Sequence, residues 1–307
     1  MAVLNWVRNK NYYPFFNKGV ERGPENSMFT VVNNTLIVGF HRLAINGLDD
    51  ASNQPMYKDG CLLICNGEIY NYKKLYTLIG KEPRTGSDCE VIIDLYNKYG
   101  IDQTLDMLDG VFAFVLYDYE NHRIFAARDK YGVRPLFIAR DFEEYIFASE
   151  IKMIPGSIQH CEQINPGTCM AFRILNGRWE ISDSFYFTKG YSINNILKKN
   201  TMSVIHDALV EAVKKRVETT ERPIACLLSG GLDSSLITSI VCRLSNFKVK
   251  TFSIGLEGSE DLYYAKKVAE YLDTNHTSIT VTEDDFFNAI PEVIRVIESY
   301  DTTSVRA

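Results

Sequence analysis

The chain has 307 residues, 46% of them apolar and 23% charged, which is the composition of an ordinary globular protein long enough for two domains. Its net charge of −6 excludes a broad basic nucleic-acid-binding surface and favours small-molecule chemistry. The seven cysteines include no Cys-x-x-Cys pair and predict reduced thiols in a cytoplasmic protein, and the five histidines lack the spacing of a zinc site. No apolar run approaches the ~18 residues of a membrane span, so we expect neither a membrane anchor nor a secretory signal.

The first 185 residues interleave strand and helix patterns. Residues 1–28 show no clear period, but beyond them short apolar runs bounded by turn residues are typical of strands packed on both faces. These runs lie at 35–40, 61–65, 111–116, 123–127, 145–148 and 170–174. Helical spacing occurs at 72–79 and at 89–99, where Val91, Leu95 and Tyr99 share one face. The mixture predicts an α+β sandwich with stacked sheets over residues 1–185.

The second part of the chain alternates strands and helices regularly. Residues 186–200 are rich in Asn, Lys and Gly and form the best linker candidate. Beyond them, helices are expected at 203–217, 233–244, 261–272 and 284–299, and strands at 224–228, 250–254 and 277–281. This order predicts an α/β domain over residues 201–307, with a Rossmann-like parallel sheet and its ligand at the carboxyl ends of the strands. Three strands are few for such a sheet, so we expect a C-terminally truncated domain.

The sequence Cys-Leu-Leu-Ser-Gly-Gly-Leu-Asp-Ser-Ser at 226–235 joins the first of these strands to a helix. Gly230 and Gly231 let the backbone approach a ligand closely, and the helix start near Asp233 offers free N–H groups to an anion. An ordinary strand–turn–helix corner with capping serines is the alternative. No lysine follows as it would in a Walker loop, so the motif favours ATP cleavage between the α and β phosphates over phosphoryl transfer.

Four short motifs, at 40–45, 66–71, 85–90 and 128–136, suggest a site that binds a free amino acid and hydrolyses an amide. An amino acid needs a guanidinium for its carboxylate and carboxylates for its ammonium group, which Arg42, Asp88 and Glu68 could supply. Asn66 and the Gly67 N–H could stabilise an oxyanion. Taken singly, each has a structural alternative: a turn at Asn66-Gly67, a surface ion pair at Arg42 and a helix N-cap at Asp88.

Together with the loop at 229–235 and the closing residues 298–307, these motifs resemble the glutamine-hydrolysing asparagine synthetases from about Arg22 to the C-terminus. The resemblance implies an Ntn-type αββα glutaminase domain of the class II glutamine amidotransferases, followed by an ATP-pyrophosphatase domain. It implies glutamine, aspartate and ATP as substrates, with Mg²⁺ neutralising the pyrophosphate, and it leaves open a homodimer. The residues that it assigns to glutamine are Arg42, Leu43, Ala44, Ile45, Asn46, Asn66, Gly67, Glu68 and Asp88, with Asn66 and Gly67 also forming the oxyanion hole. Those that it assigns to ATP are Leu228, Ser229, Gly230, Gly231, Leu232, Asp233, Ser234, Ser235 and Ile254.

The chain departs from this family near both ends. The family's nucleophile is the cysteine after the initiator methionine, whereas this position is Ala2, and an internal cysteine has no free amine beside it. We therefore expect glutamine hydrolysis by this chain to be lost. The stretch before Arg22 is shorter than in the family, so we expect the first strand to be missing or replaced. A second serine–glycine loop that completes the ATP and aspartate site is absent, which puts aspartate adenylation in doubt.

Three other functions are compatible with these departures. The chain could be a non-catalytic relative that binds glutamine or a nucleotide, or an adenylating ligase that uses free ammonia. A ligase of the β-lactam synthetase type is a further alternative, and the sequence Tyr-Asp-Thr-Thr at 300–303 favours asparagine synthetase over it.

Overall fold

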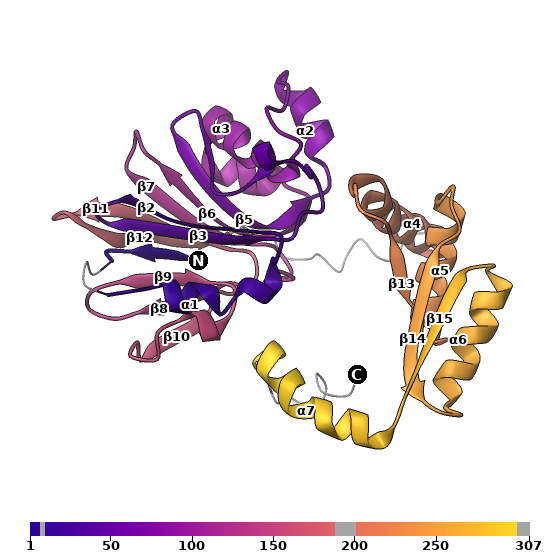
Figure 1. Ribbon diagram of the computed structural model, residues 1–307. Helices are drawn as coiled ribbons and strands as arrows, with labels where there is room; N and C mark the ends of the chain where they lie inside the picture. The colour runs from indigo at the N-terminus through magenta and orange to yellow at the C-terminus, as the bar shows by residue number, and fades with distance from the viewer. Residues whose placement is uncertain (7–9, 188–200, 300–307) are drawn as a thin grey trace. The chain divides into compact units, whose positions relative to one another are not determined.

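The computed structural model describes residues 1–6, 10–187 and 201–299 (Figure 1). The chain separates into two compact units, Met1–Tyr191 and Ser192–Ala307, and each is described by itself. Most of the predicted linker at 186–200 lies outside the described residues. No helix in the described ranges combines the length and apolar character needed to traverse a bilayer.

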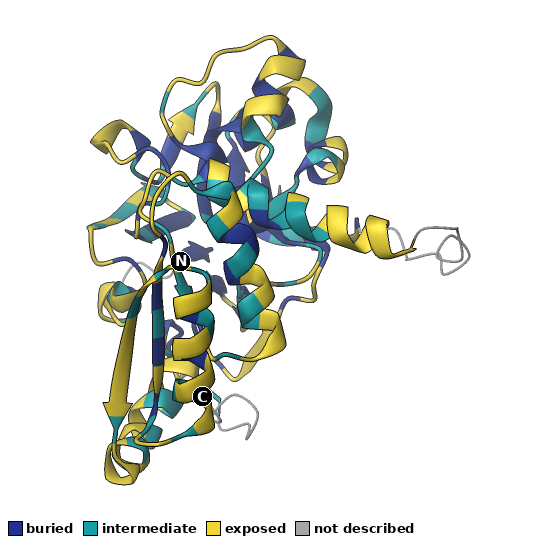
Figure 2. Cartoon of the chain, turned by 90° about the vertical axis from the view of Figure 1, so that its right-hand side faces the viewer, coloured by how far each residue is buried: buried dark blue, intermediate teal, exposed yellow. Residues whose placement is uncertain are grey.

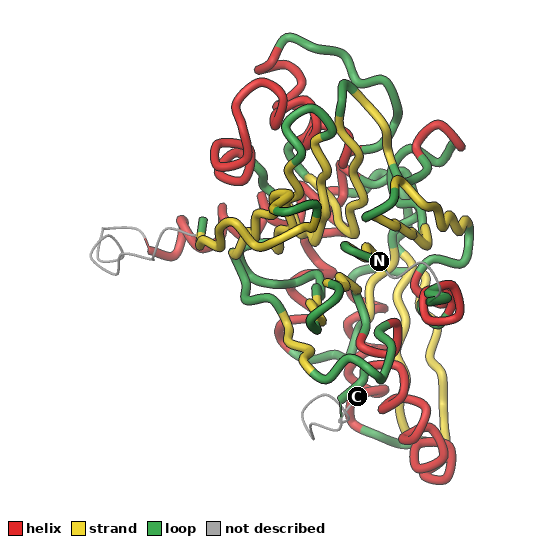
Figure 3. The backbone as a smooth tube through the Cα atoms, turned by 90° about the vertical axis from the view of Figure 1, so that its left-hand side faces the viewer, coloured by secondary structure: helices red, strands yellow, loops and turns green. Residues whose placement is uncertain are grey.

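The first unit contains two antiparallel sheets of six strands, with the orders β10-β8-β9-β1-β3-β2 and β12-β11-β7-β6-β5-β4. The strands are β1 (Ala2–Leu4), β2 (Asn26–Asn33), β3 (Leu36–Arg42), β4 (Met56–Lys58), β5 (Cys61–Ile69), β6 (Gly110–Asp118), β7 (Arg123–Arg128), β8 (Phe137–Arg140), β9 (Tyr145–Ala148), β10 (His160–Gln163), β11 (Thr168–Leu175) and β12 (Arg178–Tyr186). The helices are α1 (Tyr13–Asn17), α2 (Tyr72–Ile79) and α3 (Val91–Met107), with 3₁₀ turns η1 (Val20–Arg22), η2 (Asp50–Ser52), η3 (Asp88–Glu90) and η4 (Ile151–Met153). Loops and turns join most consecutive strands, as the backbone trace shows (Figure 3).

The two sheets stack face to face, and helices cover their outer faces. The contact between the sheets buries side chains from both, including Leu36, Leu62 and Phe172. A second apolar cluster joins the outer face of β5, β6 and β7 to α2 and α3, and a third joins β1, β3 and β9 to α1 and η4. Figure 1 accordingly shows α2 and α3 on one side of the stack and α1 on the other. The central strands are apolar on both faces, and the predicted α+β sandwich is confirmed.

Strand β1 lies in the interior of its sheet, although the sequence pattern predicts no element there. It pairs antiparallel with β3 on one side and β9 on the other, and its three side chains are fully buried. The amine of Met1 donates to the Gly39 carbonyl at 2.8 Å, and burial lowers the pKa of this amine to about 5. Three residues are too few to show a period, so the sequence pattern gave no signal. Of the two expectations for the first strand, that it is missing is wrong, because a short strand is present; that it is replaced stays a prediction.

Most of the other strands without a sequence signal are edge strands. Strands β2 and β10 form the two edges of one sheet, and β12 and β4 form those of the other. All four residues of β10 are exposed, and most residues of β2 and β12 are exposed or half-buried. An edge strand with a solvated face carries no continuous apolar run, which is the pattern on which the strand predictions depended.

The second unit is built on a three-stranded parallel sheet of order β13-β14-β15. Its strands are β13 (Ala225–Leu227), β14 (Lys250–Leu256) and β15 (Asn275–Val281), and its helices are α4 (Thr201–Thr219), α5 (Leu232–Leu244), α6 (Glu260–Tyr271) and α7 (Glu283–Ile297). Helices α4 and α5 form one small core around Val213, Ile240 and Val249, and α6 packs on Leu228. The predicted alternation and the parallel sheet are confirmed, with helix and strand ends shifted by at most two residues.

The other face of this parallel sheet has little cover among the described residues. Leu227, Ile254 and Ile279 are 83%, 58% and 46% exposed, and the register places the last two side by side. Strand β15 is exposed over most of its length, and α7 has no buried residue (Figure 2). Parallel sheets ordinarily bury both faces, so this apolar surface is unusual.

Candidate functional site

A cavity of about 120 Å³ lies between the end of β3, the middle of β5 and the turn η3. Of the residues predicted to bind glutamine, those that line it are Arg42, Leu43, Ala44, Ile45, Asn46, Asn66, Gly67 and Asp88. Glu68 follows Gly67 on β5 but does not line the cavity. The structure thus gathers residues from all four predicted motifs, because Arg134 of the motif at 128–136 lines the cavity as well.

Arg42 is buried at the cavity wall, with 8% of its surface exposed. Its Nη1 donates to the Asp49 carbonyl at 3.0 Å and to Asn53 Oδ1 at 2.8 Å, and its Nη2 donates to the Asn46 and Gly47 carbonyls. Its Nε–H takes part in none of these bonds. The guanidinium therefore closes the loop after β3, and the alternative of a surface ion pair at Arg42 is wrong.

Asp88 is a buried carboxyl group at the start of η3, with 5% exposed surface. Its Oδ2 accepts a hydrogen bond from the Ile69 N–H at 2.6 Å. Burial, together with the nearby charge of Glu68, raises the pKa of Asp88 to about 6, although the hydrogen bond from Ile69 opposes the rise. Ser87, not Asp88, caps the turn by accepting from the Cys89 N–H at 3.3 Å, so the N-cap alternative for Asp88 is wrong.

Asn66 and Gly67 lie inside strand β5, opposite Ala113 and Phe112 of β6. The alternative of a simple Asn-Gly turn is therefore wrong. A side chain at Gly67 would place its Cβ 2.3 Å from the Val111 carbonyl oxygen, so only glycine fits this close strand contact. The two residues present the backbone of β5 to the cavity without a bulky side chain at the second position.

Several buried polar atoms around the cavity have no hydrogen-bond partner in the described part of the chain. They are Asn46 Oδ1 and Nδ2, Asn66 Nδ2 and Arg134 Nε, and all three residues line the cavity. A buried polar atom without a partner costs roughly 1–3 kcal/mol, so native proteins keep few of them. Their convergence on one cavity with a buried carboxyl group indicates a site for a small polar ligand.

The loop after β13 brings the backbone of the second unit to a helix start. Gly231 is the N-cap of α5, with no side-chain cap bond, which disfavours the alternative of a corner capped by serines. Gly230 has φ +79°, and an added Cβ would lie 2.5 Å from the Ala265 nitrogen of α6. Glycine is therefore required there by conformation and by space. The first N–H groups of a helix have no acceptor within it, which is the property that anion-binding helix starts use.

The serine hydroxyls of this loop contact one another rather than the core. Ser229 Oγ and Ser234 Oγ are 3.0 Å apart, and Ser234 Oγ lies 3.3 Å from the Gly231 carbonyl. Ser235 Oγ is buried and has no partner within the described residues. Leu232 and Asp233 are exposed, and a cavity of about 400 Å³ beside the loop is lined by Asp233 and Ser234 among others. The loop thus offers hydroxyls and amides to a ligand.

The two apolar residues assigned to ATP differ in their surroundings. Leu228 is 1% exposed, packs against Ala265 and Ala269 of α6, and donates its N–H to the Phe252 carbonyl at 2.8 Å. Ile254 is 58% exposed on the uncovered face of the sheet. A ligand at this edge could contact the side chain of Ile254 but only the backbone of Leu228.

Residues 5–189 match the family model of the glutamine amidotransferase domain. The chain belongs to this family. Residues 204–307 match the family model of asparagine synthase, so the two predicted domain families occur in the predicted order.

Curated relatives agree with this family assignment. A probable glutamine-hydrolysing asparagine synthetase of Acanthamoeba polyphaga mimivirus is 38% identical over 312 residues, which covers 93% of this chain and 56% of that protein. The glutamine-hydrolysing asparagine synthetase of Gallus gallus is 36% identical, covering 94% and 57%, and that of Asparagus officinalis is 40% identical, covering 87% and 46%. The chain therefore spans about half the length of these relatives, and the family predicted from the sequence is confirmed.

Position 2 of this amidotransferase chain lies next to the cavity. Ala2 is fully buried and lines a smaller adjoining cavity of about 40 Å³ together with Asn66. Its methyl group cannot attack an amide. Cys65 and Cys89 do line the main cavity, but a hydrogen bond with Cys65 and burial raise the pKa of the Cys89 thiol well above its ordinary value. A thiol kept protonated is a poor nucleophile, so this environment disfavours Cys89 as a nucleophile.

Two other arginines, Arg22 and Arg134, line this amidotransferase cavity and have no role predicted from the sequence. Arg134 ends a tight turn in which the buried Asp129 carboxylate accepts the N–H groups of Phe112, Tyr131, Val133 and Arg134. The sequence signal was the charged turn at 128–136, but nothing in the spacing says that it faces β5. Arg22 Nη1 lies 3.4 Å from Glu150 Oε1. Arg22 belongs to η1, a segment for which the sequence pattern predicts neither a helix nor a strand.

Proposed function

We propose that this chain carries the glutamine site and the ATP site of a glutamine-dependent asparagine synthetase. In the parent reaction, ATP activates aspartate as an adenylate with release of pyrophosphate, and ammonia from glutamine displaces AMP to give asparagine. The observation that supports the glutamine site most directly is the cavity with unpartnered Asn66 and Arg134 atoms beside the buried carboxyl group of Asp88. Glutamine offers an amide carbonyl, a carboxylate and an ammonium group that complement these groups.

Each group of glutamine has a counterpart in the cavity. Asp88 holds the ammonium group, and Glu68 adds negative charge behind it. Arg42 shapes the loop Leu43–Asn46 and contributes its Nε–H to the carboxylate. Asn66 Nδ2 and the Gly67 N–H bind the side-chain carbonyl, where an oxyanion would form during hydrolysis.

We propose that this chain binds glutamine without hydrolysing it. Hydrolysis in this family needs a thiol whose own terminal amine removes its proton, and Ala2 stands at the nucleophile's position. The oxyanion donors and the substrate pocket remain, because neither depends on position 2. Binding without turnover is the expected result.

In the second unit, we propose that the pyrophosphate part of ATP lies on the loop Ser229–Ser235. The amides at the start of α5 and the serine hydroxyls would donate to phosphate oxygens, and the glycine at 230 brings the backbone close. Mg²⁺, when bound, would offset the phosphate charge, and Asp233 in the first turn of α5 is the acidic residue placed to hold it. Ile254 would contact the adenine side of the nucleotide.

Two binding titrations and one activity assay test these proposals on the full chain. Calorimetry with glutamine, and separately with ATP and Mg²⁺, should show binding that Asp88→Asn and Asp233→Ala respectively weaken. Glutamate release from glutamine should stay at background. Steady release would refute the argument from Ala2, whereas absence of any glutamine binding would refute the pocket assignment itself.

The ammonia-dependent ligase is the second candidate, and Ala2 is the observation that favours it. A chain without a glutaminase nucleophile could still form an aspartyl-adenylate and accept free ammonia. Incubation with ATP, aspartate and ammonium chloride should then yield AMP and pyrophosphate. Absence of both products would leave the non-catalytic binding protein as the better description.

We also propose a cytoplasmic location, because all seven cysteines are free thiols. A homodimer is proposed by analogy with the family, and light scattering on the purified chain decides it. A monomer mass would refute it.

A further inference from the structure

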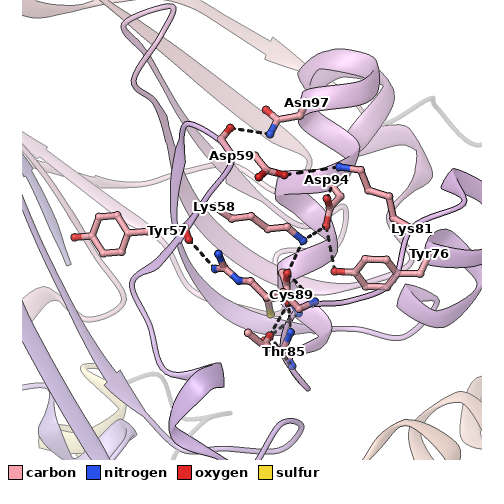
Figure 4. Close-up of polar contacts among 12 residues, drawn as sticks. Tyr57, Lys58, Asp59, Tyr76, Lys81, Thr85, Cys89, Asp94 and Asn97 are labelled. Atoms are coloured by element: carbon pink, nitrogen blue, oxygen red, sulfur yellow. Dashed lines mark hydrogen bonds and ion pairs between the residues drawn. The ribbon is translucent and has the colours of Figure 1, made fainter.

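A buried group of charged side chains lies directly behind the turn that carries Asp88. Lys58 of β4 contacts Glu90 Oε1 at 2.5 Å. Lys58 also contacts Asp94 Oδ2 at 2.6 Å (Figure 4). Lys81 contacts the other oxygen of Asp94 at 2.8 Å, and the hydroxyl of Tyr76 lies 3.3 Å from Asp94. The side chains of Glu90 and Asp94 are 1% and 0% exposed, so these are paired charges inside the protein.

Glu90 differs from Asp94 in what its oxygens hold besides lysine. Oε1 of Glu90 accepts the Arg84 N–H at 3.2 Å, and Oε2 accepts both the N–H and the hydroxyl of Thr85 at 2.7 Å. Asp94 bonds only side chains among the contacts described for it, those of Lys58, Lys81 and Tyr76. One carboxylate therefore ties the backbone of a loop, and its neighbour does not.

The loop tied by Glu90 forms part of the cavity wall. It runs from Arg84 to Asp88. Glu90 lies in η3 with Asp88, so its bonds to Arg84 and Thr85 join the start of the loop to its end. Ser87 and Asp88 line the cavity. Gly86 packs against the loop after β3, since an added Cβ there would lie 2.7 Å from the Gly47 Cα. Movement of this loop would displace Asp88 and the wall opposite it together.

We infer that Glu90 is a positioning residue for the glutamine pocket: it holds the loop 84–88 so that Asp88 faces the ammonium group of the substrate. Lys58 supplies the charge that keeps Glu90 in place, and Asp94 balances the two lysines. The inference rests on the proposed function, because it assigns Glu90 a role through Asp88. Glu90 itself does not line the cavity, so it acts on the ligand only through the loop.

The chain offers a matched pair of variants to test this. Glu90→Gln and Asp94→Asn each remove one buried negative charge beside Lys58, but only Glu90→Gln puts an amide where the Arg84 and Thr85 N–H groups need an acceptor. We expect Glu90→Gln to weaken glutamine binding about tenfold or more in calorimetry, and Asp94→Asn to change it less than about twofold, even if both lower the melting temperature. Equal losses in the two variants, or normal binding by Glu90→Gln, would overturn the inference.

A double-mutant cycle separates positioning from a general loss of structure. If Glu90 acts through Asp88, the variant with both Asp88→Asn and Glu90→Gln should bind glutamine no worse than Asp88→Asn alone. Multiplying losses would contradict this. Where Glu90→Gln does not fold, Thr85→Val removes one donor to Glu90 and the acceptor of the Ser87 N–H, two bonds that hold the loop, and should weaken binding about two- to fivefold. Normal binding by that variant would count against the role of Glu90.

Hydrogen exchange gives a readout that needs no ligand. The Ile69 N–H is bound to Asp88 Oδ2, so its protection reports whether Asp88 is in place. Exchange at Ile69, Arg84 and Thr85 should accelerate in Glu90→Gln and stay near the wild-type rate in Asp94→Asn. If the wild-type chain shows no glutamine binding, the glutamine assignment fails, while unchanged exchange in Glu90→Gln would refute the positioning role separately.

Discussion

Replacing Gly230 by alanine is the most specific perturbation of the proposed phosphate loop. Gly230 has φ +79°, a conformation that costs an alanine roughly 1–2 kcal/mol. The new Cβ would also lie 2.5 Å from the Ala265 nitrogen and 2.6 Å from the Tyr264 carbonyl carbon, both backbone atoms that cannot rotate away. Pushing α6 away from the loop adds about 1–3 kcal/mol, the cost of overpacking a core. The expected loss in stability of the second unit is therefore about 2–5 kcal/mol.

The neighbouring glycine provides the control. Gly231 has φ −70°, and an added Cβ would meet only Ser229 Oγ at 3.4 Å, so Gly231→Ala should cost about 1 kcal/mol or less. Hydrogen exchange measured by mass spectrometry on peptides of β13 and β14 gives the assay, since both tryptophans, Trp6 and Trp179, lie in the first unit. Amides that exchange by opening of the whole unit should exchange at least about thirtyfold faster in Gly230→Ala and at most about fivefold faster in Gly231→Ala. Equal rates in the two variants would show that the loop does not press against α6.

Three further predictions concern the first unit. Folding raises the pKa of Asp88 from 3.8 to about 6, so this group stabilises the folded state most at low pH and loses that contribution as the pH rises to about 6. Glutamine binding has the opposite dependence because it needs the carboxylate. The affinity for glutamine should weaken about tenfold per pH unit below about 6. Calorimetry across this range checks it, and a profile in Asp88→Asn that still bends near the same pH would contradict it. Asn66→Ala should weaken glutamine binding about tenfold with little change in melting temperature, because Asn66 Nδ2 has no partner to lose in the described part of the protein. A large fall in melting temperature would show that Asn66 is structural. Ala2→Cys, produced with Met1 removed, should gain glutamate release, measured by a coupled assay against the parent chain; no gain, with glutamine still bound, would show that more than the thiol is missing.

The second unit was the more predictable half, because each strand there is followed by a helix of regular period. The strand at 145–148 and the helix at 72–79 of the first unit were also predicted with their observed ends. The helical pattern at 89–99 was less accurate. It begins as the 3₁₀ turn η3, and α3 is kinked at Gly100, whose φ of +77° is non-helical, before a second helical stretch that ends at Met107. A glycine with positive φ normally ends a helix, so the second stretch, beyond the kink, lies outside the predicted pattern.

The candidate site was predictable in its residue types and unpredictable in its contacts. Arg42 was expected to face a substrate carboxylate, but whether its four nearest acceptors are a ligand or its own loop depends on how residues 46–53 fold back. Glu90 follows Asp88 in the motif at 85–90, yet its partner Lys58 lies 32 residues earlier, on strand β4. Pairings across such distances follow from tertiary packing, which local patterns do not encode.

The uncovered face of the parallel sheet has a practical consequence for handling the protein. This face carries an exposed apolar surface formed by Leu227, Ile254 and Ile279. In the described part of the chain β13 is an edge strand, so its backbone groups can pair with a strand of another molecule. Concentrated samples should therefore aggregate through this surface, and Ile279→Asp or Ile279→Lys should delay the onset of turbidity. The same substitution at Ile254 would also alter the proposed nucleotide site, so solubility and nucleotide binding can be changed separately at these two neighbouring positions.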